Sequence, residues 1–446
     1  MDPQVRIFIA SNRAFKQMTK DKIHLGRMNQ KIVPNPDVAH IRNSFFEGNS
    51  TFWKISIPNR LLLTILIMLA AKLVGAAVVY GLLDIQTSAT LWFDINRVFK
   101  WDQNTVFLQN ASTAARWSYT FVGWDSAWYL SIMTRGYGFS PDSYAFPPGL
   151  PLSGLLFDLF FKNPVVSGAV CSLVFGVLWL PCFQLVAERY MSKQAAFGST
   201  LLFAFSPYVF LFTTLVYAEG LFLFFTLSAW YLFKTGKRLS TFWLAAASAL
   251  SRVTGFVLIL PMLLESLKEK TKRKVYSVIL SLGPLFAFSF WMVYLKLTTN
   301  DFLPFLHVTE WSSIYTIPTL LLMGLPKEGF NIFQTVFQNY AAPLNWLTPY
   351  ALVFALIVPP FLIYLLARIE KSLAAYALVY YLGVIASGGL ASIPRYLSVL
   401  FPLWMPLAAR LSMGKKSIVF VGVALAVSFI ISLSMWVDFL NGVFVA

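Results

Sequence analysis

The sequence predicts an all-α polytopic membrane protein, and three observations support this fold class. Hydrophobic residues make up 58% of the 446 positions and charged residues only 12%. Apolar runs of about 20 residues recur along the chain, and each is long enough to cross a hydrocarbon layer of roughly 30 Å as a helix. The runs lack the ten-residue alternation of outer-membrane strands, so a helical bundle is favoured over a barrel.

We expect nine crossings, at about 61–83, 164–187, 196–214, 216–233, 275–297, 347–367, 373–391, 396–411 and 417–437. Residues 1–60 carry ten Lys and Arg against four acids and lack the apolar core of a signal peptide, so the first span is uncleaved. The expected regions are a cytoplasmic basic arm at 1–60, one transmembrane domain at 61–437 and a short outer tail at 438–446. The arm either lies on anionic lipid or is a solvated tail.

The net charge of +16 reflects topology and not a nucleic-acid-binding face, because the basic residues gather in short segments between the apolar runs. With nine spans these segments fall on the cytoplasmic side: Arg189 and Lys193, Lys234 to Arg238, residues 268–274, Arg368 and Lys371, and Arg410 to Lys416.

Residues 239–264 do not fit this scheme as a span, because a crossing there would place KEKTKRK on the outer side. The break SRVTG at 251–255 leaves two pieces of about 12 residues, roughly 18 Å each and too short to cross. We therefore expect a re-entrant hairpin with both ends cytoplasmic and Arg252 near its tip. The long outer segments 84–163 and 298–346, the second amphipathic at 314–341, are expected to roof a cavity.

Metal-dependent and nucleotide-hydrolysing mechanisms are disfavoured. The three histidines are scattered, and the chain has no HExxH, CxxC or DxD motif and no phosphate-binding Gly-rich loop. Cys171 and Cys182 lie eleven residues apart on one predicted helix, too far along it to form a disulfide.

The stretch GWDSAWYLSIMTRGYGFSPDSYAFPPGLPL at 123–152 contains the first candidates. Asp125 follows Trp124 at the start of a helical run, where a partly shielded carboxylate suits general-base catalysis. An N-cap is an equally good interpretation of this Asp. Arg135, close to Tyr137, either binds an anion or ends the helix, and the helix end is favoured.

Three later segments place ionisable groups at span ends. Tyr217 and Glu219 lie in SPYVFLFTTLVYAEGLFLFF at 206–225, and the Glu is either a site residue or a solvated helix-start carboxylate. Arg252 has no neutralising neighbour in sequence, which makes a lipid phosphate a suitable partner. Arg395 in IPRYLSVLFP is also explained by snorkelling. Lys72, within the first span, either snorkels or pairs with an acid.

Together these segments resemble the GPI mannosyltransferase 2 family, which adds the second mannose to glycosylphosphatidylinositol precursors. The 124–152 stretch resembles the family's WD, GY and AFFPL.P elements. SPYVFLFTTLVYAEGLF is similar to its Pro-containing segment ending in Tyr-Ser-Glu-Ser, SRVTG takes the place of its Arg-Ser-Asn-Gly, and PRYLSVLFP is similar to its late Arg-Phe-Leu element. The order matches over about residues 61–411.

The resemblance implies a GT-C fold and an inverting glycosyltransferase that uses a polyprenyl-phosphate sugar, usually dolichyl-phosphate mannose. It implies that Asp125 is the general base and that Arg252 or Arg395 stabilises the leaving phosphate without a metal or other cofactor. Glu219 would orient sugar hydroxyls or assist Asp125. The expected substrate-binding residues are Trp124, Arg135, Tyr137, Tyr217, Glu219, Arg252 and Arg395.

Three departures from the family pattern leave the acceptor open. Tyr-Ala-Glu-Gly replaces Tyr-Ser-Glu-Ser, Val-Thr replaces Ser-Asn, and the outer loops are compact for the family. A microbial, especially archaeal, relative acting on a lipid-linked or cell-envelope glycan fits as well as a GPI enzyme, so the expected location is a prokaryotic cell membrane, or the endoplasmic reticulum if the host is eukaryotic. The alternative function is a lipid or small-molecule transporter, which commonly shows matched broken helices in two halves.

Overall fold

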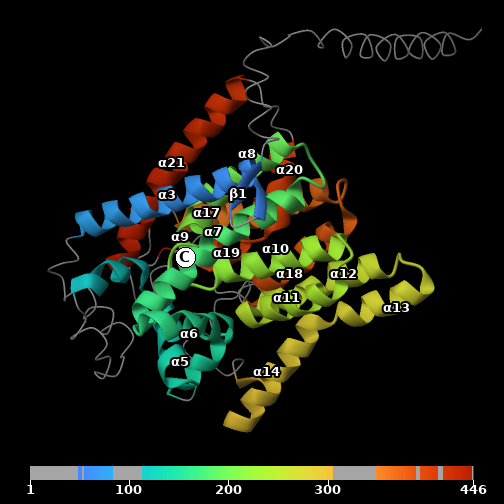
Figure 1. The fold of residues 1–446 in the computed structure, drawn as a ribbon, viewed down its shortest axis with the longest axis horizontal. Coiled ribbons are helices and arrows are strands. Elements are labelled where there is room, and N and C mark those ends of the chain that lie inside the picture. The colour runs from blue at the N-terminus through green and yellow to red at the C-terminus, as the bar shows by residue number, and fades with distance from the viewer. Residues whose placement is uncertain are drawn as a thin grey trace, which may run out of the picture. The chain divides into compact units, whose positions relative to one another are not determined.

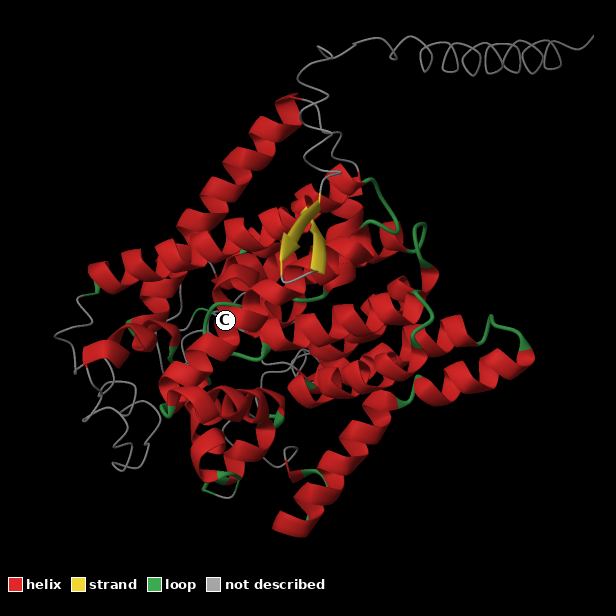
Figure 2. Cartoon of the chain, in the orientation of Figure 1, coloured by secondary structure: helices red, strands yellow, loops and turns green. Residues whose placement is uncertain are grey.

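The computed structural model describes residues 49–52, 55–83, 113–137, 139–304, 348–387, 392–409, 415–443 and 445. These residues are helical apart from loops and one antiparallel hairpin, β1 (Asn49–Phe52) with β2 (Ile55–Pro58) (Figure 2). The helical fold class is confirmed, whereas the hairpin was not predicted. The chain divides into the units Met1–Leu62 and Leu63–Ala446. Most of the basic arm and the amphipathic stretch 314–341 lie outside the described residues.

Four described helices are long and apolar enough to cross a membrane: Asn59–Leu82 (α3), Pro164–Ala187 (α7), Lys272–Thr299 and Val419–Leu440. The third comprises α13 (Thr271–Leu280) and α14 (Gly283–Thr299), and the fourth belongs to α21 (Lys415–Leu440). They coincide with the first, second, fifth and ninth expected spans. The total of nine remains a prediction. Both cysteines lie in α7 and are free, as expected.

Besides the fifth span, which is divided between α13 and α14, two other expected spans are not continuous helices. The run 196–214 forms α8 (Lys193–Phe205) and α9 (Pro207–Phe212), and residues 213–218 are not helical before α10 (Glu219–Lys234) begins. The run 396–411 divides into α19 (Ile393–Ser398), η7 (Phe401–Leu403) and α20 (Trp404–Ala409). The breaks precede Pro207 and surround Pro402, because proline lacks an N–H donor and disfavours helical conformation in the residue before it.

The remaining elements complete the bundle around α10. They are η1 (Thr113–Phe121), α5 (Ser126–Arg135), η2 (Pro141–Ala145), α6 (Gly149–Phe161), α11 (Arg238–Ser251), η3 (Val253–Leu258), α12 (Ile259–Ser266), α17 (Thr348–Leu366) and α18 (Lys371–Ser387). Helix α10 packs against α7 and α11, α11 packs against α14, and α12 packs against α18 (Figure 1). Fully buried aromatics, among them Trp179, Trp230 and Trp436, fill the core.

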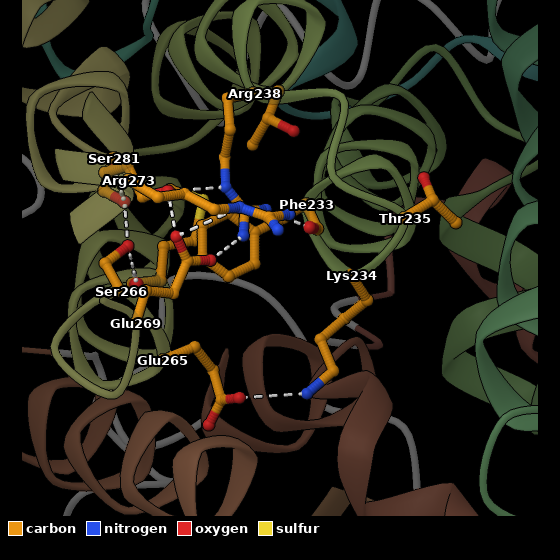
Figure 3. Close-up of polar contacts among 12 residues, drawn as sticks. Phe233, Lys234, Thr235, Arg238, Glu265, Ser266, Glu269, Arg273 and Ser281 are labelled. Carbon is orange, nitrogen blue, oxygen red and sulfur yellow. Dashed lines mark hydrogen bonds and ion pairs between the residues drawn. The ribbon is translucent and has the colours of Figure 1, made fainter. Parts of the chain in front are cut away.

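The predicted hairpin at 239–264 is confirmed as a turn-back with Arg252 at its tip. Helix α11 ends at Ser251, and η3 begins at Val253. The two ends of the hairpin lie together, because Arg238 at the start of α11 forms an ion pair with Glu269 just beyond α12. Figure 3 shows this contact beside the Lys234–Glu265 pair, whose Nζ and Oε2 atoms are 3.1 Å apart. That these ends face the cytoplasm remains a prediction.

The length of α10 separates two polar regions. Lys234, the last residue of α10, takes part in the ion pairs in Figure 3, whereas Glu219 is the first residue of this helix. The helix has 16 residues, which corresponds to about 24 Å along its axis. Of the basic segments predicted to share one side, those at 234–238 and 268–274 therefore lie at the end of α10 opposite to Glu219.

Candidate active site

Asp125 lies at a tight turn between η1 and α5. Its side chain does not cap α5. Instead, its Oδ2 accepts a hydrogen bond from Arg395 Nη1 at 2.8 Å, so the N-cap interpretation is wrong for this carboxylate. The backbone N–H of Asp125 donates to Tyr217 Oη at 3.1 Å. The Asp125 side chain is 16% exposed, which leaves it accessible to a small group from outside the protein.

The backbone before Asp125 is unusual. Trp124 has φ of 49°, in the left-handed region that residues with a side chain rarely adopt. Its indole Nε1 donates to the Phe439 carbonyl at 3.1 Å, which ties the turn to the end of α21. An added Cβ on Gly123 would lie 2.5 Å from the Phe439 ring, so a side chain at this position would force the ring to shift. The turn holds the Trp124 backbone in a conformation that a residue with a side chain does not favour, and Asp125 follows it with ordinary helical dihedrals.

Glu219 is the central carboxylate of the site. It is the first residue of α10 and 0% exposed, so the alternative of a solvated helix-start carboxylate is wrong. Its Oε1 accepts from Arg395 Nε at 2.7 Å and also from Arg252 Nη1. Its Oε2 is buried and has no hydrogen-bond partner among the described residues. A buried acceptor without a partner costs free energy, so binding of a group that brought a donor to this oxygen would be favoured.

These contacts form a chain of alternating charge, Asp125–Arg395–Glu219–Arg252, which we call the charged cluster. Two carboxylates and two guanidinium groups balance, as burial of charge requires. The members come from four places far apart in sequence: the turn before α5, the start of α10, the tip of the α11–α12 hairpin and α19. The structure thus brings together four of the residues predicted from sequence.

Arg395 is the residue that links the two carboxylates. Snorkelling does not explain it, because its side chain is only 7% exposed and lies within the bundle. Its guanidinium lies over the rings of Phe212 and Tyr217, with centroid distances of 4.7 and 4.4 Å. Arg252 lies 5.1 Å from the Tyr396 ring centroid. Such cation–π contacts hold a planar guanidinium in a fixed orientation.

Tyr217 and Tyr129 form the aromatic wall beside Asp125, with ring centroids 6.4 Å apart in an edge-to-face arrangement. Burial, and next the charge of Glu219, raise the pKa of the Tyr129 phenol, so it stays protonated. The sequence interpretation missed Phe212 and Tyr396. The only available signal for Tyr396 was its position directly after Arg395.

Arg135 and Tyr137 are not part of the charged cluster. Arg135 lies exposed at the C-terminal end of α5, about 15 Å along the helix from Asp125. Tyr137 donates to the Phe146 carbonyl and stacks on Tyr144 at 5.7 Å. These contacts hold the segment after α5, and contact of Tyr137 with a substrate stays a prediction.

Among the described residues, no three His, Cys, Asp or Glu side chains come together in a way that could hold a metal ion. The chemical resources of the charged cluster are a partly exposed carboxylate, an unpaired buried carboxylate oxygen and two guanidinium groups. This set can accept a proton and can stabilise an anion nearby.

Comparison with known proteins identifies relatives. A sequence profile described as "Mannosyltransferase (PIG-V)" matches residues 64–310, more than half of the chain. The crystal structure of ArnT from Cupriavidus metallidurans bound to undecaprenyl phosphate is similar, at 14% identity and a TM-score of 0.43. The similarity covers 69% of this chain and 59% of that one. No curated protein matched the sequence.

Proposed function

The chain belongs to the PIG-V mannosyltransferase family and is a membrane glycosyltransferase, and on that premise we propose that it transfers mannose from a polyprenyl (dolichyl) phosphate. The acceptor in this proposal is a lipid-linked or cell-envelope glycan on the non-cytoplasmic side. The donor class is the one implied by the resemblance to GPI mannosyltransferase 2. The membrane is that of a prokaryotic cell, or the endoplasmic reticulum in a eukaryotic host.

The observation that carries the proposal is the partly exposed Asp125 carboxylate, whose Oδ2 lies 2.8 Å from Nη1 of the buried Arg395. In the proposed reaction, an acceptor hydroxyl oxygen attacks C1 of mannose as the bond from C1 to the phosphate oxygen breaks. Asp125 takes the hydroxyl proton, and the polyprenyl phosphate leaves with the electron pair of the broken bond. A single displacement of this kind inverts the anomeric carbon.

Arg395 and Arg252 supply the positive charge that the departing phosphate requires. Arginine suits this role because its planar donors match phosphate oxygens. Glu219 fixes both guanidinium groups from the other side, and its unpaired Oε2 accepts from a sugar hydroxyl in the proposal. The positive groups are in place before the charge develops, which is how electrostatic preorganisation lowers a barrier.

The test is mannose transfer by purified protein from radiolabelled dolichyl-phosphate mannose to candidate glycolipids. Asp125→Asn should lower kcat by about 100- to 10,000-fold, the usual contribution of a general base, and leave expression and folding intact, with a modest fall in melting temperature because Arg395 loses a charged acceptor. Asp158→Asn, the same change at a carboxylate that accepts from Ser167 at 2.8 Å, is the matched control. Transfer by Asp125→Asn within tenfold of wild type would reject the base assignment, and transfer from a nucleotide sugar instead would reject the donor class.

A further inference from the structure

Lys72 is a charged residue that the proposed reaction does not use. It lies near the middle of α3 and is 0% exposed, so it does not snorkel. No described Asp or Glu forms an ion pair with it, so the expected acidic partner is absent from the described residues. A buried cation without a carboxylate requires other acceptors, because its desolvation costs several kcal/mol.

The acceptors come from the C-terminal end of α9. Lys72 Nζ donates to Thr213 Oγ1 at 2.9 Å, to Thr214 Oγ1 at 2.7 Å and to the Phe210 carbonyl at 3.4 Å. The two threonine hydroxyls use their own protons on the carbonyls of Val209 and Phe210. Their oxygens are thereby left to accept, and the three ammonium protons of Lys72 match three acceptors.

These threonines begin the non-helical segment 213–218, which joins α9 to α10. Backbone polar groups in such a segment need partners inside the protein. The Val216 N–H donates to the Phe121 carbonyl at 2.8 Å, and Tyr217 Oη accepts from the Asp125 N–H at 3.1 Å. Glu219 follows directly. The segment therefore connects Lys72 on one side with both carboxylates of the charged cluster on the other.

Close backbone packing leaves this segment little room to move. An added Cβ on Gly176 of α7 would lie 2.0 Å from the Thr213 carbonyl oxygen and 3.5 Å from Lys72 Nζ. An added Cβ on Gly220 would lie 3.0 Å from the Gly176 backbone. Only glycine allows α7 to approach α10 and the segment this closely.

We propose that Lys72 is a positioning residue, which fixes segment 213–218 so that Tyr217 and Glu219 hold Asp125 and the two arginines in catalytic geometry. The proposal rests on the proposed function for its kinetic part. Lys72 touches none of the four members of the charged cluster in the contacts described. Its effect passes through the Thr213–Thr214 pair and the backbone that follows.

The first test is Lys72→Met, which keeps side-chain length and removes the ammonium. We expect kcat to fall about 10- to 100-fold with KM for the donor changed less than about threefold, because small displacements of catalytic groups act on the chemical step. Leu73→Met, on the half-exposed neighbouring residue, is the control and should leave both parameters unchanged. Unchanged kcat in Lys72→Met, with or without a lower melting temperature, overturns the proposal.

The second test does not depend on activity. Hydrogen exchange of the amides in segment 213–218 should be at least about tenfold faster in Lys72→Met than in wild type, with α7 unchanged, because local opening controls exchange. Unchanged exchange in this segment overturns the positioning role even if no mannose transfer is found. Absence of transfer in wild type with the expected exchange would reject the proposed function alone.

A rescue experiment tests whether Lys72 acts through its hydrogen bonds to Thr213 and Thr214 or only fills space in the core. Thr213→Val with Thr214→Val removes two of the three Lys72 acceptors and leaves a buried ammonium poorly paired. Adding Lys72→Met to this variant should raise its melting temperature, since the unpaired charge is gone. A further decrease in melting temperature on adding Lys72→Met would show that the Lys and Thr side chains act independently and overturn the proposal.

Discussion

Replacing Glu219 by Gln tests the charged cluster most directly. The carboxylate is fully buried and its Oε1 accepts from Arg395 and Arg252 at once. Gln is nearly the same size, so packing is kept while the negative charge is lost. One carbonyl oxygen must then serve two guanidinium groups, and Asp125 becomes the only carboxylate in the cluster.

The expected loss of activity in Glu219→Gln follows from the two hydrogen bonds that Glu219 Oε1 accepts. A hydrogen bond with a charged group contributes about 1.5–3 kcal/mol, and a bond between two ions lies at the upper end of this range while a bond between an ion and a neutral group lies at the lower end, so losing the acceptor's charge costs about 1–1.5 kcal/mol per bond. For two bonds this is about 2–3 kcal/mol. At 1.36 kcal/mol per factor of ten, kcat/KM should fall about 30- to 150-fold if the transition state needs both arginines in place.

The assay is mannose transfer over a range of donor concentrations, with melting temperature measured in parallel. Glu188→Gln, the same change at the C-cap of α7, is the control and should leave transfer unchanged. Glu219→Asp keeps the charge but shortens the side chain, and it should retain more activity than Glu219→Gln. A kcat/KM for Glu219→Gln within threefold of wild type would refute the argument that this carboxylate orders the arginines.

Two further predictions concern Arg395, which links the two carboxylates, and Glu269, which lies near the Lys234 end of α10. Arg395→Lys should lower kcat/KM by about 10- to 100-fold, measured by the same assay, because one ammonium cannot reproduce the separate Nε and Nη1 contacts to two carboxylates. Partial burial disfavours charge on Glu269, but hydrogen bonds from Ser277 and Arg238 outweigh it and lower the pKa of this carboxyl. The ionised Glu269 carboxylate therefore stabilises the fold fully at pH values above the unfolded pKa of about 4.5, and this stabilisation is lost as the pH falls through the lower folded pKa. The difference in melting temperature between wild type and Glu269→Gln should therefore narrow below pH 4.5.

The members of the charged cluster, though not their ion pairs with one another, could be predicted from sequence because the cost of burying charge restricts the possibilities. Asp125 and Arg395 are separated by 270 positions; Arg395 lies beside a long apolar run, and Asp125 lies in an aromatic stretch of the first outer segment. Ionisable groups in such places must pair or line a functional site. The same reasoning did not distinguish Arg135, which lies exposed at the C-terminal end of α5 and does not belong to the charged cluster.

The helix breaks could not be predicted in the same way. Hydropathy averages over a window of about 19 residues, so the run 196–214 reads as one span although α8 ends at Phe205. Pro207 was a visible signal, but proline is also tolerated inside membrane helices, as Pro181 within α7 shows. The partner of Lys72 was hidden for a related reason, because threonine hydroxyls in an apolar run carry no charge that would mark them as its acceptors.

The breaks have a common consequence for the site. Asp125 precedes α5, Glu219 opens α10, Arg252 separates α11 from η3, and Arg395 lies in the six-residue α19. A continuous helix presents successive side chains around its axis, whereas a helix end directs one side chain past the end of the element. Four ends meeting at one place can therefore concentrate four charges. Each end also leaves backbone groups unpaired, and in an apolar interior the protein must supply their partners, as Tyr217 does for the Asp125 N–H and Lys72 does for the end of α9. The residues that hydrogen-bond the backbone at the helix ends are thus linked to the residues that hold the charges. For this reason a change at Lys72 should alter the position of Asp125.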